Sequence, residues 1–208
     1  MLLRENTLTQ FTEVLSSDAP VPGGGSIAAL NGALAAALLH MVGCLTAGNE
    51  KYEEFHAEIQ EIMVNAKRLQ NALLIVVDED TEAFNKISAV FSMPEETDRE
   101  KSAKNNAMQA ALKSATLTPL AILKAAHGCL TLAALAYGKL NTSCVSDFGC
   151  SVLCALASAR SAWLKVKINL SGINDEVFRK KNGSEARKIL ADSERVAEEL
   201  YNRIEQAL

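Results

Sequence analysis

The sequence contains few aromatic residues and few prolines, and it has no excess of positive charge. Aromatic residues make up 5% of its 208 positions, only 4 are proline, and the formal net charge is −4. Alanine and leucine, which recur throughout, favour helices, whereas the scarcer β-branched and aromatic residues favour strands. The net negative charge provides no field that would gather the phosphates of a nucleic acid. We therefore expect an all-α protein that binds no nucleic acid.

The 5 cysteines are an odd number and form no C-x-x-C pair. Structural zinc sites use such pairs together with nearby histidines, so we expect reduced cysteines and no metal site. The first ten residues are polar and include Arg4 and Glu5, whereas a secretory signal has an apolar segment there. These features predict a cytoplasmic protein. The chain length suits one continuous core, so residues 1–208 are interpreted as a single helical domain.

Two segments, 26–46 and 145–170, are rich in Ala, Ser, Cys and Gly. The first contains no Asp, Glu, Lys or Arg and is long enough to span a bilayer. It lacks a basic flank and carries Asn31 and His40, so a buried helix explains it better and no membrane contact is expected. Both segments are predicted to be central helices, because small residues let helix axes approach closely. Since they are apolar on nearly every side, we expect a homodimer that completes their coverage.

The periodicity of apolar residues predicts a compact bundle of about seven or eight helices. Capping boxes at Thr7 and Thr97 mark two helix starts, while Ser26 and Asn182 are interpreted as caps of two others. Pro119 suits the first turn of a helix, so it is expected to separate two helices. The expected helical ranges are 7–17, 26–46, 51–91, 97–117, 119–139, 145–170 and 184–207.

Three stretches of the sequence form distinctive motifs. Residues 20–26 read Pro-Val-Pro-Gly-Gly-Gly-Ser, and residues 77–84 read Val-Asp-Glu-Asp-Thr-Glu-Ala-Phe. A third set combines Asn141, the pair at 146–147 and the Asn-Leu pair at 169–170. Together these motifs span nearly the whole chain and resemble those of the formiminotetrahydrofolate cyclodeaminase and methenyltetrahydrofolate cyclohydrolase family. Two positions depart from the family's pattern, since Lys165 stands where Asn is expected and Lys104 where Arg is expected.

The resemblance implies a helical dimer with a folate pocket, which acts on a tetrahydrofolate derivative without a further cofactor. The activity it favours is that of a methenyltetrahydrofolate cyclohydrolase, which hydrolyses the 5,10-methenyl bridge to 10-formyltetrahydrofolate. The alternatives are a formiminotetrahydrofolate cyclodeaminase, which releases ammonia to give 5,10-methenyltetrahydrofolate, and a folate-binding helical dimer without turnover. The implied catalytic residues are Asp78, Asp80 and Asp147. The implied substrate-binding residues are Gly23, Gly24, Gly25, Ser26, Asn141, Ser146, Lys165 and Asn169.

The candidate carboxylates have both a catalytic and a structural interpretation. Either folate reaction involves a cationic bridged carbon, beside which a carboxylate can act as a base or as a stabilising charge. Asp78 and Asp80 would point about 160° apart on a helix, so one pocket cannot easily receive both. A solvated acidic helix face is the alternative for this pair. Asp147 either serves the reaction or complements the dipole at a helix start.

The glycines and asparagines also have two interpretations. Gly23, Gly24 and Gly25 either make a tight turn into a helix or expose backbone N–H groups to an anionic group such as a folate glutamate tail. They do not form a nucleotide-binding loop, because the Lys of that motif is missing. Asn141 and Asn169 either hydrogen-bond the edges of the pterin or satisfy turns and buried carbonyl groups.

Overall fold

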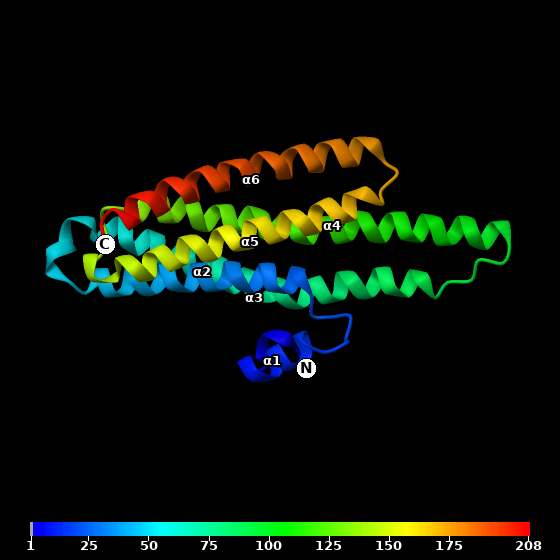
Figure 1. Ribbon diagram of the computed structural model, residues 1–208, viewed down its shortest axis with the longest axis horizontal. Helices are drawn as coiled ribbons and strands as arrows, with labels where there is room; N and C mark the ends of the chain where they lie inside the picture. Colours follow the sequence, from blue (N-terminus) through cyan, green and yellow to red (C-terminus); the bar gives the residue numbers. More distant parts are fainter. Residues whose placement is uncertain (1) are drawn as a thin grey trace.

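The computed structural model describes residues 2–208 and shows long helices lying side by side, with the short helix α1 outside their bundle (Figure 1). The α-helices are α1 Leu8–Leu15, α2 Gly24–Ala47, α3 His56–Phe91, α4 Asp98–Ala136, α5 Val145–Ser171 and α6 Glu176–Glu205; the 3₁₀ helices are η1 Leu3–Glu5, η2 Glu50–Phe55 and η3 Thr142–Cys144. Residues 2–208 include no strand, which confirms the all-α prediction. The predicted count of seven or eight helices is wrong, because this part of the chain forms six α-helices.

Helix α4 continues through Pro119, where the sequence predicts a break between two helices. Proline has no N–H, so the carbonyl group of Ala115, four residues earlier, loses its helical donor. The side-chain amide of Asn169 on α5 replaces that donor, with Nδ2 2.8 Å from the Ala115 oxygen. A hydrogen bond from a distant element thus satisfies the freed carbonyl group, and the two expected helices are one.

The predicted cap at Ser26 is wrong, whereas the capping boxes at Thr7 and Thr97 are confirmed. α2 begins at Gly24, so Ser26 lies within its first turn. The Ser26 side chain is fully buried, and its Oγ donates to the carbonyl oxygen of Val77 on α3 at 3.1 Å. The hydroxyl group therefore joins α2 to α3 instead of closing the end of α2.

α6 begins well before residue 184, and the predicted cap at Asn182 is wrong. The cap is Asp175, whose Oδ1 accepts the N–H of Phe178 at 3.0 Å. Asn182 lies inside the helix, where its Nδ2 donates to the Phe178 carbonyl group. Close packing on α5 supports this polar stretch, since a methyl group added at Gly183 would lie 3.3 Å from Leu170. Tertiary packing thus outweighs the weak apolar periodicity here.

The two small-residue helices, α2 and α5, pack directly against each other, as predicted. Ser158 on α5 donates its hydroxyl proton to the carbonyl oxygen of Ala28 at 2.7 Å, and Ser151 donates to that of Ala35 at 2.7 Å. Both alanines are fully buried, and such short side chains allow the close approach that these bonds require. α2 also contacts α3, and α5 also contacts α4 and α6.

Three segments are long and apolar enough to cross a membrane by length and composition, namely α2, α4 and residues 142–171. The buried shares of their most apolar windows are 50%, 50% and 44%. About half of each window is therefore covered by the bundle, and the rest is left for solvent or for another surface. The absence of membrane contact stays a prediction.

Candidate functional site

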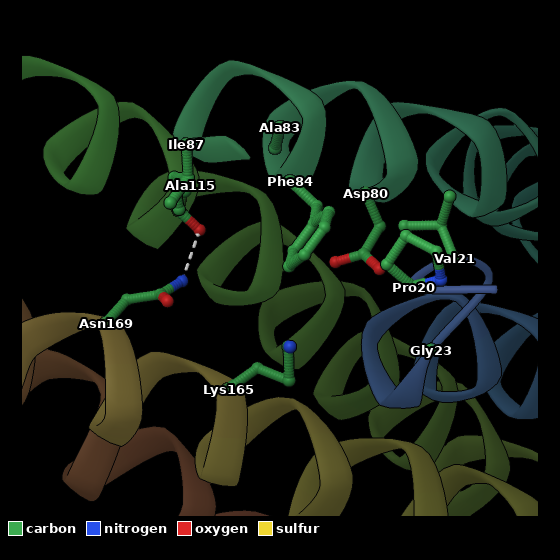
Figure 2. A pocket seen from close by; sticks show the side chains of 10 residues that line it. All are labelled: Pro20, Val21, Gly23, Asp80, Ala83, Phe84, Ile87, Ala115, Lys165 and Asn169. Carbon is green, nitrogen blue, oxygen red and sulfur yellow. Dashed lines mark hydrogen bonds between the residues drawn. The ribbon is translucent and has the colours of Figure 1, made fainter. Parts of the chain in front are cut away.

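A small cavity lies where the loop before α2 meets α3, α4 and the C-terminal half of α5 (Figure 2). Its volume is about 90 Å³. Apolar side chains form much of its wall, and three polar side chains project from α3 and α5. The lining residues are Pro20, Val21, Gly23, Asp80, Ala83, Phe84, Ile87, Ala115, Lys165 and Asn169.

The Asp80 carboxylate packs against the first turn of α2, at a place where only glycine leaves room. A Cβ atom at Gly25 would lie 1.9 Å from Asp80 Oδ1, far inside the distance at which atoms can coexist. The next residue, Ser26, places its Oγ 3.3 Å from Asp80 Oδ2. None of the three consecutive glycines has a positive φ. Gly25 is thus required because it lets the Asp80 carboxylate pack closely against α2. The sequence did not suggest this role.

Opposing effects act on the Asp80 carboxyl group. Burial is the largest of them, and it raises the pKa of Asp80 above its usual value because a charged carboxylate is poorly solvated there. The positive charge of Lys165 and hydrogen bonds from Ser26 lower the pKa, but they only partly offset burial. The pocket therefore contains a carboxylate that takes up a proton more readily than an exposed aspartate does.

Lys165 and Asn169 project into the pocket from successive turns of α5. The Lys165 ammonium group points across the cavity toward Asp80 and Phe84 (Figure 2). Its stem passes the start of α2, because a Cβ atom added at Gly24 would lie 3.9 Å from Lys165 Cδ. The side-chain amide of Asn169 donates a hydrogen bond to the carbonyl oxygen of Ala115. This bond agrees with the interpretation that Asn169 satisfies a buried carbonyl group. Its side-chain oxygen is left for other partners.

Asp78 faces the N-terminal segment and does not line the pocket. Its Oδ1 accepts the backbone N–H of Leu3 at 2.5 Å, and its Oδ2 lies 3.2 Å from Arg4 Nη1. The second interaction is an ionic contact without hydrogen-bond alignment, so Oδ2 is buried without a hydrogen-bond donor among the described residues. The two aspartates thus point to different neighbours, as their spacing on a helix requires.

The sequence model of the formiminotransferase-cyclodeaminase family matches residues 7–188, which include the glycine loop, Asp80, Lys165 and Asn169. The chain belongs to this family. It is 36% identical over 198 residues to a methenyltetrahydrofolate cyclohydrolase of Methylorubrum extorquens, and the match covers 95% of both chains. The predicted family resemblance is therefore confirmed.

Other members of the formiminotransferase-cyclodeaminase family match with lower identity. The formimidoyltransferase-cyclodeaminase of Gallus gallus is 26% identical, but the chain spans only 34% of that protein's length. A crystal structure of the formiminotetrahydrofolate cyclodeaminase from Thermotoga maritima aligns with a TM-score of 0.83 and 26% identity. That alignment covers 99% of this chain and 97% of the other, so the whole bundle is shared.

The remaining candidate residues, Ser146, Asp147 and Asn141, lie at the opposite end of α5 from Lys165. Asp147 and Lys165 are five helical turns apart, about 27 Å along the axis at 1.5 Å per residue. Asn141 begins the 3₁₀ helix η3, where its Oδ1 accepts the N–H of Ser143 at 3.0 Å and its Nδ2 donates to Leu45. One chain therefore does not bring this group to the pocket.

A larger cavity of about 240 Å³ occupies that opposite end, and Asn141 contributes to its wall. Tyr52 lines it as well, and the side-chain hydrogen bond with Thr142 lowers the pKa of Tyr52. No aspartate or glutamate lines this cavity. Because it lacks a carboxylate, it does not offer the acid-base chemistry of the Asp80 pocket.

The apolar residues of the pocket wall were not among the site residues predicted from the sequence. Phe84 lies one helical turn after Asp80, and this spacing is the signal that could have placed it beside the carboxylate. No sequence pattern could have placed Ala115 in the pocket wall. It lies on α4 and reaches the pocket because α4 packs beside Asn169 of α5, which donates a hydrogen bond to its carbonyl group. Within residues 2–208, no group of three or more histidine, cysteine or carboxylate side chains is placed to hold a metal ion.

Proposed function

We propose that this chain is a methenyltetrahydrofolate cyclohydrolase, which opens the 5,10-methenyl bridge with water to give 10-formyltetrahydrofolate. The observation that carries the proposal is the half-buried Asp80 carboxylate, which faces Lys165 across a pocket with apolar walls. The substrate has a flat aromatic system and a delocalised positive charge on the bridge. Apolar walls suit the ring faces, and a poorly solvated carboxylate stabilises the cation strongly. The cyclohydrolase from Methylorubrum extorquens supports this choice by matching over nearly its entire length.

In the proposed mechanism, ionised Asp80 acts first as a base. It takes a proton from a water molecule as the water oxygen bonds to the methenyl carbon. The resulting hydroxyl-bearing carbon is tetrahedral and neutral. The bond from this carbon to N5 then breaks, protonated Asp80 returns its proton to N5, and the hydroxyl proton leaves to solvent. The products are the N10-formyl group and one proton.

Lys165 has two roles in this scheme. Its charge lowers the pKa of Asp80 and so opposes the effect of burial, which keeps a larger fraction of the base ionised. Its ammonium group also faces the space beside the carboxylate, where it stabilises the hydroxyl oxygen of the tetrahedral carbon as that hydroxyl loses its proton. The reaction transfers no electrons, and the proposed enzyme accordingly needs no cofactor beyond its tetrahydrofolate substrate.

The decisive experiment follows the absorbance of the methenyl bridge in buffer. The purified protein should accelerate its loss well beyond the spontaneous rate, and Asp80→Asn should remove most of the acceleration. Wild-type protein that leaves the spontaneous rate unchanged would contradict the proposal. Measuring folate binding by fluorescence quenching in parallel separates a protein that does not bind from one that binds without turnover.

A second candidate is formiminotetrahydrofolate cyclodeaminase, which the shared bundle of the Thermotoga maritima enzyme favours. In that reaction N10 attacks the formimino carbon on N5, and ammonia leaves as the methenyl bridge closes. Gain of methenyl absorbance from a formimino substrate, without accelerated loss in buffer, would establish it. Binding without either change would indicate the third possibility, a folate-binding helical dimer without turnover. Each version includes a homodimer, for which the exposed apolar surface of α2 and α5 provides the support.

A further inference from the structure

An open groove runs between α5 and α6, which are antiparallel neighbours joined by a short turn (Figure 1). Its volume of about 380 Å³ lies within the roughly 300–1,000 Å³ of small-molecule sites. Lys165 and Lys167 point about 160° apart from α5, so the first lines the Asp80 pocket and the second lines the groove. No residue lines both. This α5–α6 groove is formed chiefly by Trp163, Lys167 and Leu170 of α5 and by Arg179, Lys180 and Arg187 of α6.

The groove concentrates positive charge in a protein whose formal net charge is −4. Among the described residues that line it, Glu176 is the one carboxylate, and it pairs with Lys180 at 2.7 Å. The other cations of the groove form no ion pair within residues 2–208. Like charges gathered in this way repel one another, and a multiply charged anion relieves that repulsion. These unpaired cations are Lys167, Arg179 and Arg187.

Two further carboxylates of α6 face other helices. Glu185 pairs with Lys124 of α4 at 2.6 Å, and Glu194 pairs with Arg160 of α5 at 2.8 Å. Neither carboxylate lines the groove. The carboxylates that could neutralise the groove are thus engaged elsewhere, and its cations are left for a ligand.

The only tryptophan of the chain lies in this groove. The Arg187 guanidinium lies over the Trp163 ring, with its carbon 5.3 Å from the ring centroid. Indole rings and guanidinium planes are both surfaces on which nucleobases stack. Arg179 lies eight residues before Arg187 on α6, which is about 12 Å along the helix axis. The groove therefore suits an elongated ligand that has a flat ring at one end and negative charges at the other.

Phosphate groups match the charged end of the groove. A guanidinium group donates two parallel hydrogen bonds to phosphate oxygens, and an ammonium group adds a compact charge. Arg179 and Lys180 supply one group of each kind from α6, and Lys167 supplies a second ammonium group from α5. A chain of phosphates can contact several of these cations at once, whereas a single phosphate cannot.

We propose that the α5–α6 groove binds a nucleoside di- or triphosphate. Its base stacks on the pair formed by Trp163 and Arg187, and its phosphate chain contacts Arg179, Lys180 and Lys167. The site shares no residue with the pocket of the proposed cyclohydrolase, so the inference goes beyond that function and does not depend on it. The assignment is one of binding alone and involves no covalent step.

Calorimetric titration of the purified full-length chain tests this site, and Trp163 fluorescence reports on it directly. ATP should bind saturably and quench the fluorescence. Tripolyphosphate has the phosphate chain without the base, so it should bind roughly fivefold or more weakly, the loss expected for one stacked base. Absence of saturable ATP binding would overturn the inference. Equal affinities for ATP and tripolyphosphate would overturn the assignment to a nucleotide.

Two substitutions on α6 distinguish a built site from a general attraction of anions. Arg179→Gln should weaken ATP binding about tenfold or more, because it removes a charge-assisted contact with phosphate. Lys188→Gln is the matched control, since Lys188 is exposed on the same helix but does not line the groove. Each variant loses one positive charge, so a general attraction predicts equal losses. Equal losses, with helicity retained in both variants, would refute the site.

Trp163→Leu tests the role of the ring. Calorimetry should then find ATP bound no more tightly than tripolyphosphate, because the stacking surface is reduced. A preference for ATP that persists unchanged in this variant would contradict the placement of the base.

An acidic peptide is the competing occupant of a basic groove. A glutamate oligopeptide lacks a flat ring, so it should bind roughly fivefold or more weakly than ATP. A peptide that binds as tightly as ATP and displaces it would show that the groove recognises carboxylates, which would overturn the inference. None of these titrations measures turnover, so failure of this site and failure of the proposed function are separate results.

Discussion

At the scale of single residues, two aspartates separated by one position have different surroundings. Asp80 faces a pocket and Lys165, whereas Asp78 binds the backbone of Leu3 and the side chain of Arg4. Only the first can reach a bound substrate within the same chain. The second anchors the N-terminal segment to α3.

Substitution of each aspartate by asparagine should separate these roles. Asp80→Asn should lower kcat by about 10²-fold or more, because it removes a positioned base. Asp78→Asn should retain kcat within about threefold but lower the free energy of unfolding by about 1 kcal/mol, since it weakens a charge-assisted bond. Steady-state kinetics and urea unfolding of both variants provide the measurements. Equal loss of kcat in the two would contradict the assignment.

The pH dependence of kcat/KM should reflect the environment of Asp80. Burial raises its pKa and Lys165 lowers it, so the ionised base forms at a higher pH than for an exposed aspartate. Activity should therefore fall as the pH decreases through this raised pKa. In Lys165→Met the opposing charge is gone, so the acidic limb of the profile should move to higher pH. A limb that stays in place, while kcat falls, would show that Lys165 acts on the substrate alone.

At the scale of elements, the first turn of α2 can pack against the Asp80 carboxylate because Gly25 has no side chain. A methyl group at this position would overlap the Asp80 carboxylate, which must then move away from Ser26. Gly25→Ala should lower kcat/KM at least tenfold, although alanine favours helices by about 1 kcal/mol over glycine. Gly24→Ala is the stability control, because its methyl group has room and should not lower the free energy of unfolding. Unchanged kinetics of Gly25→Ala would separate Asp80 from catalysis.

The hydrogen bond between Asn169 and Ala115 couples α5 to the proline in α4. Asn169→Leu should destabilise the protein by about 1–3 kcal/mol, because the Ala115 carbonyl group then has no donor. Pro119→Ala restores a backbone N–H to that carbonyl group, so Asn169→Leu should cost less in its presence. Urea unfolding of the two single variants and the double variant measures this coupling. Additive effects would show that the freed carbonyl group finds another partner.

At the scale of the whole molecule, the pocket exists because distant parts of the chain converge. The loop at 20–23, the C-terminal third of α3 and the C-terminal half of α5 approach one another only when α2 lies between α3 and α5. Helix starts at Thr7 and Thr97 were predictable, since capping boxes are local patterns. The continuation of α4 through Pro119 was not predictable, because the side chain that satisfies the freed carbonyl group lies on another helix.

The amino-acid sequence by itself determined the helical class, the family and the set of polar residues from which the site is drawn. Those properties depend on local periodicity, capping and short motifs. The tertiary structure alone decided that Asp80 lines the pocket and Asp78 does not, that Gly25 makes room for the Asp80 carboxylate, and that Asn169 satisfies Ala115. The reason is physical: desolvation, close contact and replacement of a lost hydrogen bond arise between helices, and no single segment encodes the position of its neighbour.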